Sequence, residues 1–367
     1  MPPQPLVVKI FRQPERLTEL SLAEWDLLLR QAQRANLTAS LRSLFVQRGL
    51  LEQVPAPARE HLEWVRVRAE RHTQAVHWEI RQIRHALKKI DIPVILLKGA
   101  AYVQAQLPAA AGRLFSDIDI LVPKARINEV EAALMMHGWA ATHHDTYDQR
   151  YYRTWMHELP PMQHMRRGSV IDVHHAIVPE TARVHPAPEK LRADACAAGD
   201  QGDDNGQPLQ VLAPVDMVLH SAVHLFYDGE FDHGLRDLVD IHRLLRHFGD
   251  TDSFWTKLLA RAQELQLVRP LFYALRYSEH MLGTGIPVHI MREIHSGKLK
   301  GRPNPVLLAF MDQLFLRALQ PTHDSCSDWL TGPARTMLYI RGNWLRMPPL
   351  LLAKHLFHKA FISPKDT

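Results

Sequence analysis

The chain has 367 residues, of which 46% are hydrophobic and 23% are charged. This is the composition of an ordinary globular protein, and the length allows two or three domains. The net charge of +5 suits a ligand that carries phosphate but argues against a long basic tail that binds nucleic acid. The two cysteines, Cys196 and Cys326, are far apart, which argues against a disulfide framework or a zinc ribbon.

The sequence contains no run of about 18 apolar residues, so we expect no membrane span. Residues 1–5 lack the apolar stretch with a basic flank that marks an export signal. We therefore expect a cytoplasmic protein.

Residues 1–90 are predicted to form an N-terminal helical region. Ser21 and Glu24 have the spacing of a capping box at the start of a helix. Apolar residues then recur with the period of one helix face at Trp25, Leu28, Leu29 and Ala32. After two prolines, the same period predicts a long helix over residues 61–89.

Residues 91–180 are predicted to form an α/β core with a small mixed sheet. The aliphatic and β-branched run at 92–97 predicts a buried strand that ends at Lys98 and Gly99. Helices are expected at 100–106 and 124–137, and further strands at 116–122, 151–155, 162–165 and 170–177.

Residues 179–214 are rich in Ala, Asp, Gly and Pro and are predicted to be a loop-rich connection. Residues 215–367 are predicted to form a C-terminal helical domain, so the fold class is α+β with helical regions on both sides of the core. Its helices are expected at 215–226, 235–248, 253–265, 268–282, 305–319 and 349–361. The apolar and basic stretch Pro348–Phe361 is expected to dock on the protein's own core, with a membrane or a partner protein as the alternative.

Three aspartates are candidates for a metal site. Asp and Ile alternate in the strand at 116–122, so Asp117 and Asp119 share one face. Two carboxylates so placed repel each other unless a cation lies between them. Asp172, flanked by apolar residues on another predicted strand, supplies a third carboxylate. Because Mg²⁺ binds carboxylates together with substrate phosphates, we predict an Mg²⁺ site, with Mn²⁺ as the alternative.

Three segments together carry a family resemblance: Leu96–Ala101, the run from Arg113 to Val122, and Ile171–His174. They resemble the bacterial nucleotidyltransferase family that is usually left functionally uncharacterised, within the polymerase-beta-like nucleotidyltransferase superfamily. The resemblance covers about residues 20–250. It implies a small mixed sheet in which a strand, a glycine turn and a helix precede the strand with the two aspartates.

The resemblance also implies roles for particular residues. Asp117 and Asp119 hold the metals, Asp172 is the third carboxylate, and the Gly99 turn lies close to the phosphates of a bound NTP. The sequence departs from the superfamily pattern because Ala100 follows Gly99, where the pattern has Gly or Ser. The hydroxyl that often touches phosphate is therefore absent.

Other polar residues near these motifs have two alternative roles each. Lys98 is a point charge placed for a triphosphate, or a solvated lysine at a strand end. Arg113 binds phosphate or pairs with Asp117, and Ser116 contacts phosphate or hydrogen-bonds its own turn. By alternation, His174 faces the same side as the third carboxylate and is expected to line the site.

His220 and His224 are four residues apart on a predicted helix and share a face. Asp237 and Asp240 follow on the next helix. We expect the histidines to be core residues or to form hydrogen bonds between helices. The alternative is a second metal site of the kind found in metal-dependent phosphohydrolases.

The sequence favours an enzyme that transfers a nucleoside monophosphate from an NTP to an acceptor hydroxyl. The acceptor can be a small molecule, a sugar, a protein side chain or an RNA end. The alternatives are a regulatory module that binds nucleotide without turnover, and a metal-dependent phosphohydrolase.

Overall fold

The computed structural model describes residues 4–142, 146–198, 209–296, 299–349 and 352–353. Its helices are α1 (Leu6–Arg12), α2 (Leu22–Arg34), α3 (Thr38–Gln47), α4 (Ala56–Leu87), α5 (Lys98–Gln104), α6 (Ile127–Met136), α7 (Thr146–Trp155), α8 (Pro188–Ala193), α9 (Pro214–Tyr227), α10 (Gly234–Phe248), α11 (Asp252–Glu264), α12 (Val268–Tyr277), α13 (Val288–His295), α14 (Pro305–Ala318) and α15 (Thr331–Arg346). Its strands are β1 (Val94–Leu96), β2 (Asp117–Leu121), β3 (Trp139–Ala141), β4 (Met162–His164), β5 (Val170–His174), β6 (Cys196–Ala197) and β7 (Leu209–Val211).

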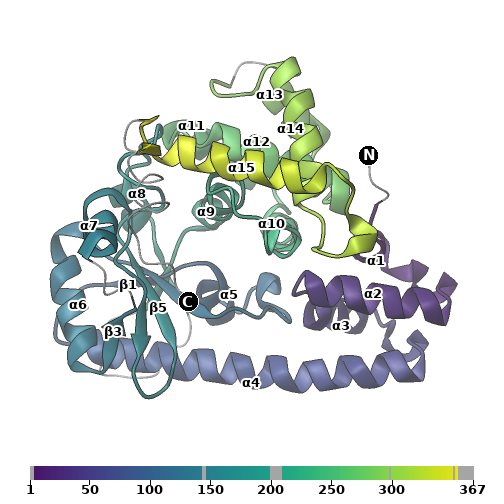
Figure 1. The fold of residues 1–367 in the computed structure, drawn as a ribbon, viewed down its shortest axis with the longest axis horizontal. Helices are drawn as coiled ribbons and strands as arrows, with labels where there is room; N and C mark the ends of the chain where they lie inside the picture. Colours follow the sequence, from purple (N-terminus) through teal and green to yellow (C-terminus); the bar gives the residue numbers. More distant parts are fainter. Residues whose placement is uncertain (1–3, 143–145, 199–208, 297–298, 350–351, 354–367) are drawn as a thin grey trace.

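The molecule has one mixed sheet with helical regions around it, which confirms the predicted α+β class. In Figure 1 the strands and α6 lie at one end of the molecule, α2 and α3 lie at the other, and α4 runs along both. The later helices, α9 to α15, cover the side of the molecule opposite α4 (Figure 1). Within the described residues, no helix is both long enough and apolar enough to cross a membrane.

The strands lie in the order β3-β4-β5-β2-β1-β7-β6. The central strands are aliphatic because both faces of the sheet are covered, and residues such as Ile95, Ile120 and Ile171 are fully buried. β2 is parallel to β5 and antiparallel to β1. The amide of Leu97 donates a hydrogen bond of 3.0 Å to the carbonyl of Asp119, so the end of β1 lies beside the aspartate strand.

The predicted helix start at Ser21 is confirmed. The Ser21 hydroxyl accepts a hydrogen bond from the Glu24 amide, and the Glu24 carboxylate accepts one of 2.8 Å from the Ser21 amide. These reciprocal bonds satisfy two of the amides that a helix leaves unpaired at its first turn. The long helix predicted at 61–89 is α4, which begins five residues earlier.

The strand predicted at 151–155 is wrong, because these residues belong to α7. Their aromatic side chains have high strand propensity, but in the structure they pack against one another at helical spacing. The rings of Tyr151 and Trp155, four residues apart, pack edge to face with centroids 5.9 Å apart, and Tyr151 packs against Met347 and Leu352 near the end of the chain. Tertiary packing thus overrides the local propensity.

The connection at residues 179–214, which was predicted to be rich in loops, also contains short regular elements that were not predicted. This segment contains α8, β6 and β7, and β7 pairs in parallel with β1 and lies next to the edge strand β6. The strand was missed because three residues are too few for a periodic signal. The predicted helix at 349–361 lies almost entirely outside the described residues, whereas α13 and α15 were not predicted.

Candidate active site

The three predicted carboxylates meet on one face of the sheet. Asp119 on β2 is the register partner of Asp172 on the parallel strand β5. Asp117 lies two positions before Asp119 and therefore projects from the same face. One carboxylate oxygen of each aspartate lies within 4.8 Å of the other two. The backbone pairing of two strands thus creates the cluster, without any contribution from loops.

The charges of this cluster are consistent with a bound cation. Oδ1 of Asp172 is buried and has no hydrogen-bond partner among the described residues. Burial and then the neighbouring Asp119 raise the pKa of Asp172 to about 7. A bound cation would satisfy the orphaned oxygen and remove the repulsion. A donor set of carboxylate oxygens alone fits Mg²⁺ or Mn²⁺ better than a softer ion.

Asp119 already has two partners from the protein. The ammonium of Lys98 lies 3.1 Å from Asp119 Oδ1, and Nε2 of His174 lies 2.9 Å from the same oxygen. Burial raises the pKa of Asp119, but Lys98 and His174 outweigh it and hold that pKa well below its usual range. Lys98 is therefore not a solvated lysine at a strand end, and His174 lines the site as predicted.

The Gly99 turn lies directly against Arg113. A Cβ atom at Gly99 would collide with the guanidinium of Arg113 and would lie 2.7 Å from the ring of Phe115. Arg113 is itself buried and donates a hydrogen bond of 2.6 Å from Nε to Asp240. It therefore pairs with Asp240 on α10 and not with Asp117, and the downstream helix positions the glycine turn through this ion pair.

We expect Gly99→Ala to lower the free energy of unfolding by about 1–3 kcal/mol, the usual cost of overpacking, because Arg113 cannot move away without leaving Asp240. Urea unfolding measures this. Gly332→Ala is the matched control, since nothing lies within 4 Å of a Cβ atom there. It lies in α15, where the change is expected to be neutral or stabilising by up to about 1 kcal/mol. Equal effects in the two variants would contradict the close approach at Gly99.

Two adjoining cavities open onto the aspartates. One, of about 370 Å³, is lined by the cationic side chains of Arg68, Lys98 and Arg236 and by Gly99 and Ser116. The other, of about 430 Å³, includes Asp172 and His174. Lys98, Asp117 and Asp119 line both. A ligand with phosphates and a second reactant can therefore approach the aspartates from different sides.

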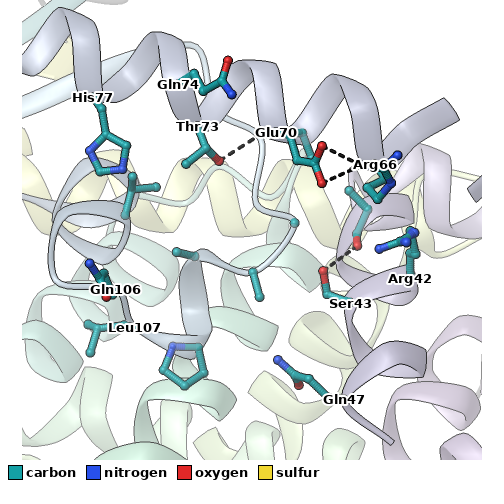
Figure 2. Close-up of a pocket in the computed structure, with 17 residues that line it drawn as sticks. Arg42, Ser43, Gln47, Arg66, Glu70, Thr73, Gln74, His77, Gln106 and Leu107 are labelled. Atoms are coloured by element: carbon teal, nitrogen blue, oxygen red, sulfur yellow. Dashed lines mark hydrogen bonds and ion pairs between the residues drawn. The ribbon is translucent and has the colours of Figure 1, made fainter. Parts of the chain in front are cut away.

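A larger cavity of about 800 Å³ lies away from the aspartates, between α3, α4 and the segment that follows α5. Figure 2 shows its polar lining, in which Arg66 is paired with Glu70, and Ser43 and Thr73 are hydrogen-bonded to the backbone. No cluster of three metal ligands lines it within the part of the chain that the structure describes. It is therefore not the candidate active site.

A comparison with protein families identifies the family of this chain. The model of a family described as "Uncharacterised nucleotidyltransferase" matches residues 21–283. The chain belongs to this family. The matched residues contain the three aspartates, the Gly99 turn and helices α9 and α10. The resemblance drawn from the sequence motifs is thereby confirmed.

No curated protein matches the chain. Among solved structures, the nucleotidyltransferase-family chain is similar to the antibiotic-resistance factor ANT(2'')-Ia at 16% identity, with a TM-score of 0.35, covering 57% of this chain and 98% of that one.

The helix α9 of this nucleotidyltransferase-family protein carries the two predicted histidines into the cavity wall. His220 is buried, and Nδ1 of His224 lies 3.1 Å from the carboxylate of Asp228. Among the described residues, neither histidine belongs to a group of three potential metal ligands. The second metal site that the sequence left open at these histidines therefore has no support.

Sequence reasoning missed several residues of the cavity. His157 and Glu158 follow α7 and line the cavity with the aspartates, but no periodic or motif signal marks them. Asp228 was also missed, because the predicted helix at 215–226 ends before it, whereas in the structure it directly follows α9.

Proposed function

We propose that the protein transfers a nucleoside monophosphate from an NTP to an acceptor hydroxyl, with divalent cations held by Asp117, Asp119 and Asp172. The observation that supports this most strongly is the convergence of three carboxylates, together with the orphaned buried oxygen of Asp172. Family membership supports the NTP as substrate. The preferred cation is Mg²⁺, with Mn²⁺ as the alternative.

The protein's own groups would divide the work. Lys98, Arg68 and Arg236 line the smaller cavity, where their charge suits a triphosphate. The backbone of Gly99 and the hydroxyl of Ser116 complete this side, and Arg113 supports the turn from behind. Bound cations would polarise the α-phosphate and stabilise the developing charge.

The cavity beside Asp172 would receive the acceptor. In the reaction, the acceptor oxygen forms a bond to the α-phosphorus and the bond to the bridging oxygen breaks. Pyrophosphate leaves with that electron pair, and the acceptor proton passes to water. The acceptor is a molecule with a hydroxyl group: a small molecule, a sugar, a protein side chain or an RNA end.

The proposal is tested by incubating the protein with each of the four NTPs, Mg²⁺ and candidate acceptors, and by following pyrophosphate release. Release that depends on Asp117 supports transfer. Nucleotide binding without release for any acceptor would make the protein a regulatory module. Release of phosphate that survives Asp117→Asn would instead favour a phosphohydrolase.

Asp172→Asn is expected to lower turnover much more than NTP affinity, because Asp172 is assigned to the acceptor side. Titration of NTP in the presence of Mg²⁺ gives the affinity, and single-turnover kinetics give the chemical step. A parallel loss of both quantities would reassign Asp172 to a structural role.

Metal binding is expected to depend on pH through Asp172, whose pKa burial and Asp119 raise to about 7. The ion must displace the proton that Asp172 carries below that pH. As the pH increases toward 7, the affinity for Mg²⁺ should therefore rise about tenfold per pH unit, and it should level off above pH 8. Calorimetric titration measures it, and Asp172→Asn should remove the slope. An affinity that is constant from pH 6 to pH 8 would contradict this coupling.

A further inference from the structure

A second group of potential metal ligands lines the cavity beside Asp172. His157 and Glu158 lie two and three residues after the end of α7, and His174 ends β5. One ligand atom from each of the three residues lies within 4.8 Å of the other two. Among the described residues, only this trio and the three aspartates form such groups. The trio shares no member with the aspartates.

One ligand atom of the trio has no partner in the protein. Nδ1 of His157 is buried and has no hydrogen-bond partner within the described ranges, a costly state for a polar atom. Nε2 of His174 lies 2.9 Å from Asp119, and Nδ1 lies 3.1 Å from Glu158. With a proton on Nε2 held at Asp119, a cation at Nδ1 would replace the proton that Nδ1 shares with Glu158. A carboxylate that fixes the tautomer in this way is a usual neighbour of a metal-binding histidine.

The distances within the trio fit a coordination sphere. In a tetrahedral site, metal–nitrogen and metal–oxygen bonds of about 2.0–2.2 Å put neighbouring ligand atoms about 3.3–3.6 Å apart. Nδ1 of His174 lies 3.1 Å from Oε2 of Glu158. The rings of His157 and His174 lie side by side, with centroids 5.3 Å apart. Small side-chain rotations therefore suffice to direct all three ligands at one ion.

The donor set distinguishes this trio from the aspartates. Two imidazoles and one carboxylate are ligands typical of Zn²⁺ and its transition-metal neighbours, whereas Mg²⁺ prefers oxygen alone. Three protein ligands leave at least one position open, and here that position faces a cavity of about 430 Å³. This is the pattern of a catalytic zinc site and not of a closed structural one.

We propose that His157, Glu158 and His174 bind a divalent cation of the zinc class, in addition to the cations of the aspartate site. The two sites are linked through the imidazole of His174, which contacts Asp119 with one nitrogen and faces Glu158 with the other. The open position points into the space assigned to the acceptor. The proposal concerns metal binding alone and stands whether or not the protein transfers nucleotides.

Co²⁺ is the probe. Its visible d–d absorption is intense at a site of low coordination number with nitrogen and oxygen ligands, and it is weak at an octahedral site with oxygen ligands. The full-length protein, stripped with a chelator that is then removed, is titrated with Co²⁺ without nucleotide. We expect an intense visible band in the wild type. His157→Ala should weaken Co²⁺ binding by more than about tenfold, since loss of even a supporting residue costs at least that much.

Two variants serve as controls for position. His224→Ala removes another imidazole of the same cavity that is paired with Asp228, and Asp117→Asn disables the aspartate site. Both should keep the intense band. Circular dichroism melting confirms that each variant folds, and His157→Cys retains three ligands and should add a thiolate-to-cobalt charge-transfer band.

Two results would overturn the proposal. One is Co²⁺ binding that is the same in wild type, His157→Ala and His157→Cys. The other is binding that disappears in Asp117→Asn, which would mean that the ion occupies the aspartate site and that His174 is a protonated bridge between two carboxylates. Pyrophosphate release is not a readout of this experiment, so its outcome is separate from that of the proposed transfer.

Discussion

Asp117→Asn is expected to lower pyrophosphate release by at least about 100-fold, because loss of a metal ligand costs more than loss of the residues that support it. The protein should remain folded. Asp117 is one of three carboxylates gathered within 4.8 Å, and an amide in its place removes part of their mutual repulsion. The melting temperature without metal is therefore expected to stay the same or to rise.

The matched control is Asp232→Asn. Asp232 lines the same cavity but is exposed and belongs to neither group of potential metal ligands. Its substitution removes the same charge from the cavity wall and should leave release within about twofold of the wild type, as expected for a surface change. Near-normal turnover of Asp117→Asn would contradict the proposed site, and equal losses in both variants would point to overall cavity charge as the cause.

The aspartate cluster could be predicted because its geometry is local. Alternation along one strand puts Asp117 and Asp119 on the same face, and the structure pairs that strand with the one that carries Asp172. The capping box at Ser21 was readable for the same reason, since both partners lie within one helical turn. Patterns with a fixed short period carry such information without knowledge of the tertiary fold.

The rest of the site depends on contacts between residues far apart in the chain. Arg113 pairs with Asp240, 127 positions later. The sequence around either residue does not predict this partner. The helix α7 was read as a strand because its aromatic side chains are half of a packing arrangement whose other half is Met347 and Leu352. Propensity describes one side of such a contact, and the partner decides the outcome.

Lys98 was a candidate site residue from the sequence, but its ion pair with Asp119 was not predicted, and this pair has a large expected consequence. Its ammonium lies 3.1 Å from Asp119, and the two side chains are only 17% and 6% exposed. Lys98→Ala leaves a buried carboxylate without its principal counter-charge, and breaking a buried pair in this way costs about 3–5 kcal/mol. We expect a loss of that size in the free energy of unfolding, measured with urea in the presence of a chelator.

Two controls isolate the charge. In a protein that already carries Asp119→Asn, Lys98→Ala should lower the free energy of unfolding much less. The amide at position 119 is neutral and does not need the positive charge of Lys98. Lys124→Ala removes a lysine whose pair with Glu180 is more than half exposed, and it should cost less than about 1 kcal/mol. Added Mg²⁺ should restore part of the stability of Lys98→Ala, since the ion replaces the missing positive charge at Asp119.

Nucleotide binding provides the second readout for Lys98. In the proposed complex, cations at Asp119 free the ammonium to contact the triphosphate, a charge-assisted bond of about 1.5–3 kcal/mol. Lys98→Ala should therefore weaken NTP binding by roughly 10- to 150-fold at saturating Mg²⁺, and it should weaken monophosphate binding less, because a monophosphate lacks the outer phosphates. Affinities within twofold of the wild type for every NTP that binds would mean that Lys98 serves only to neutralise Asp119. The loss of stability would then remain while the assignment of Lys98 to the phosphates would fall.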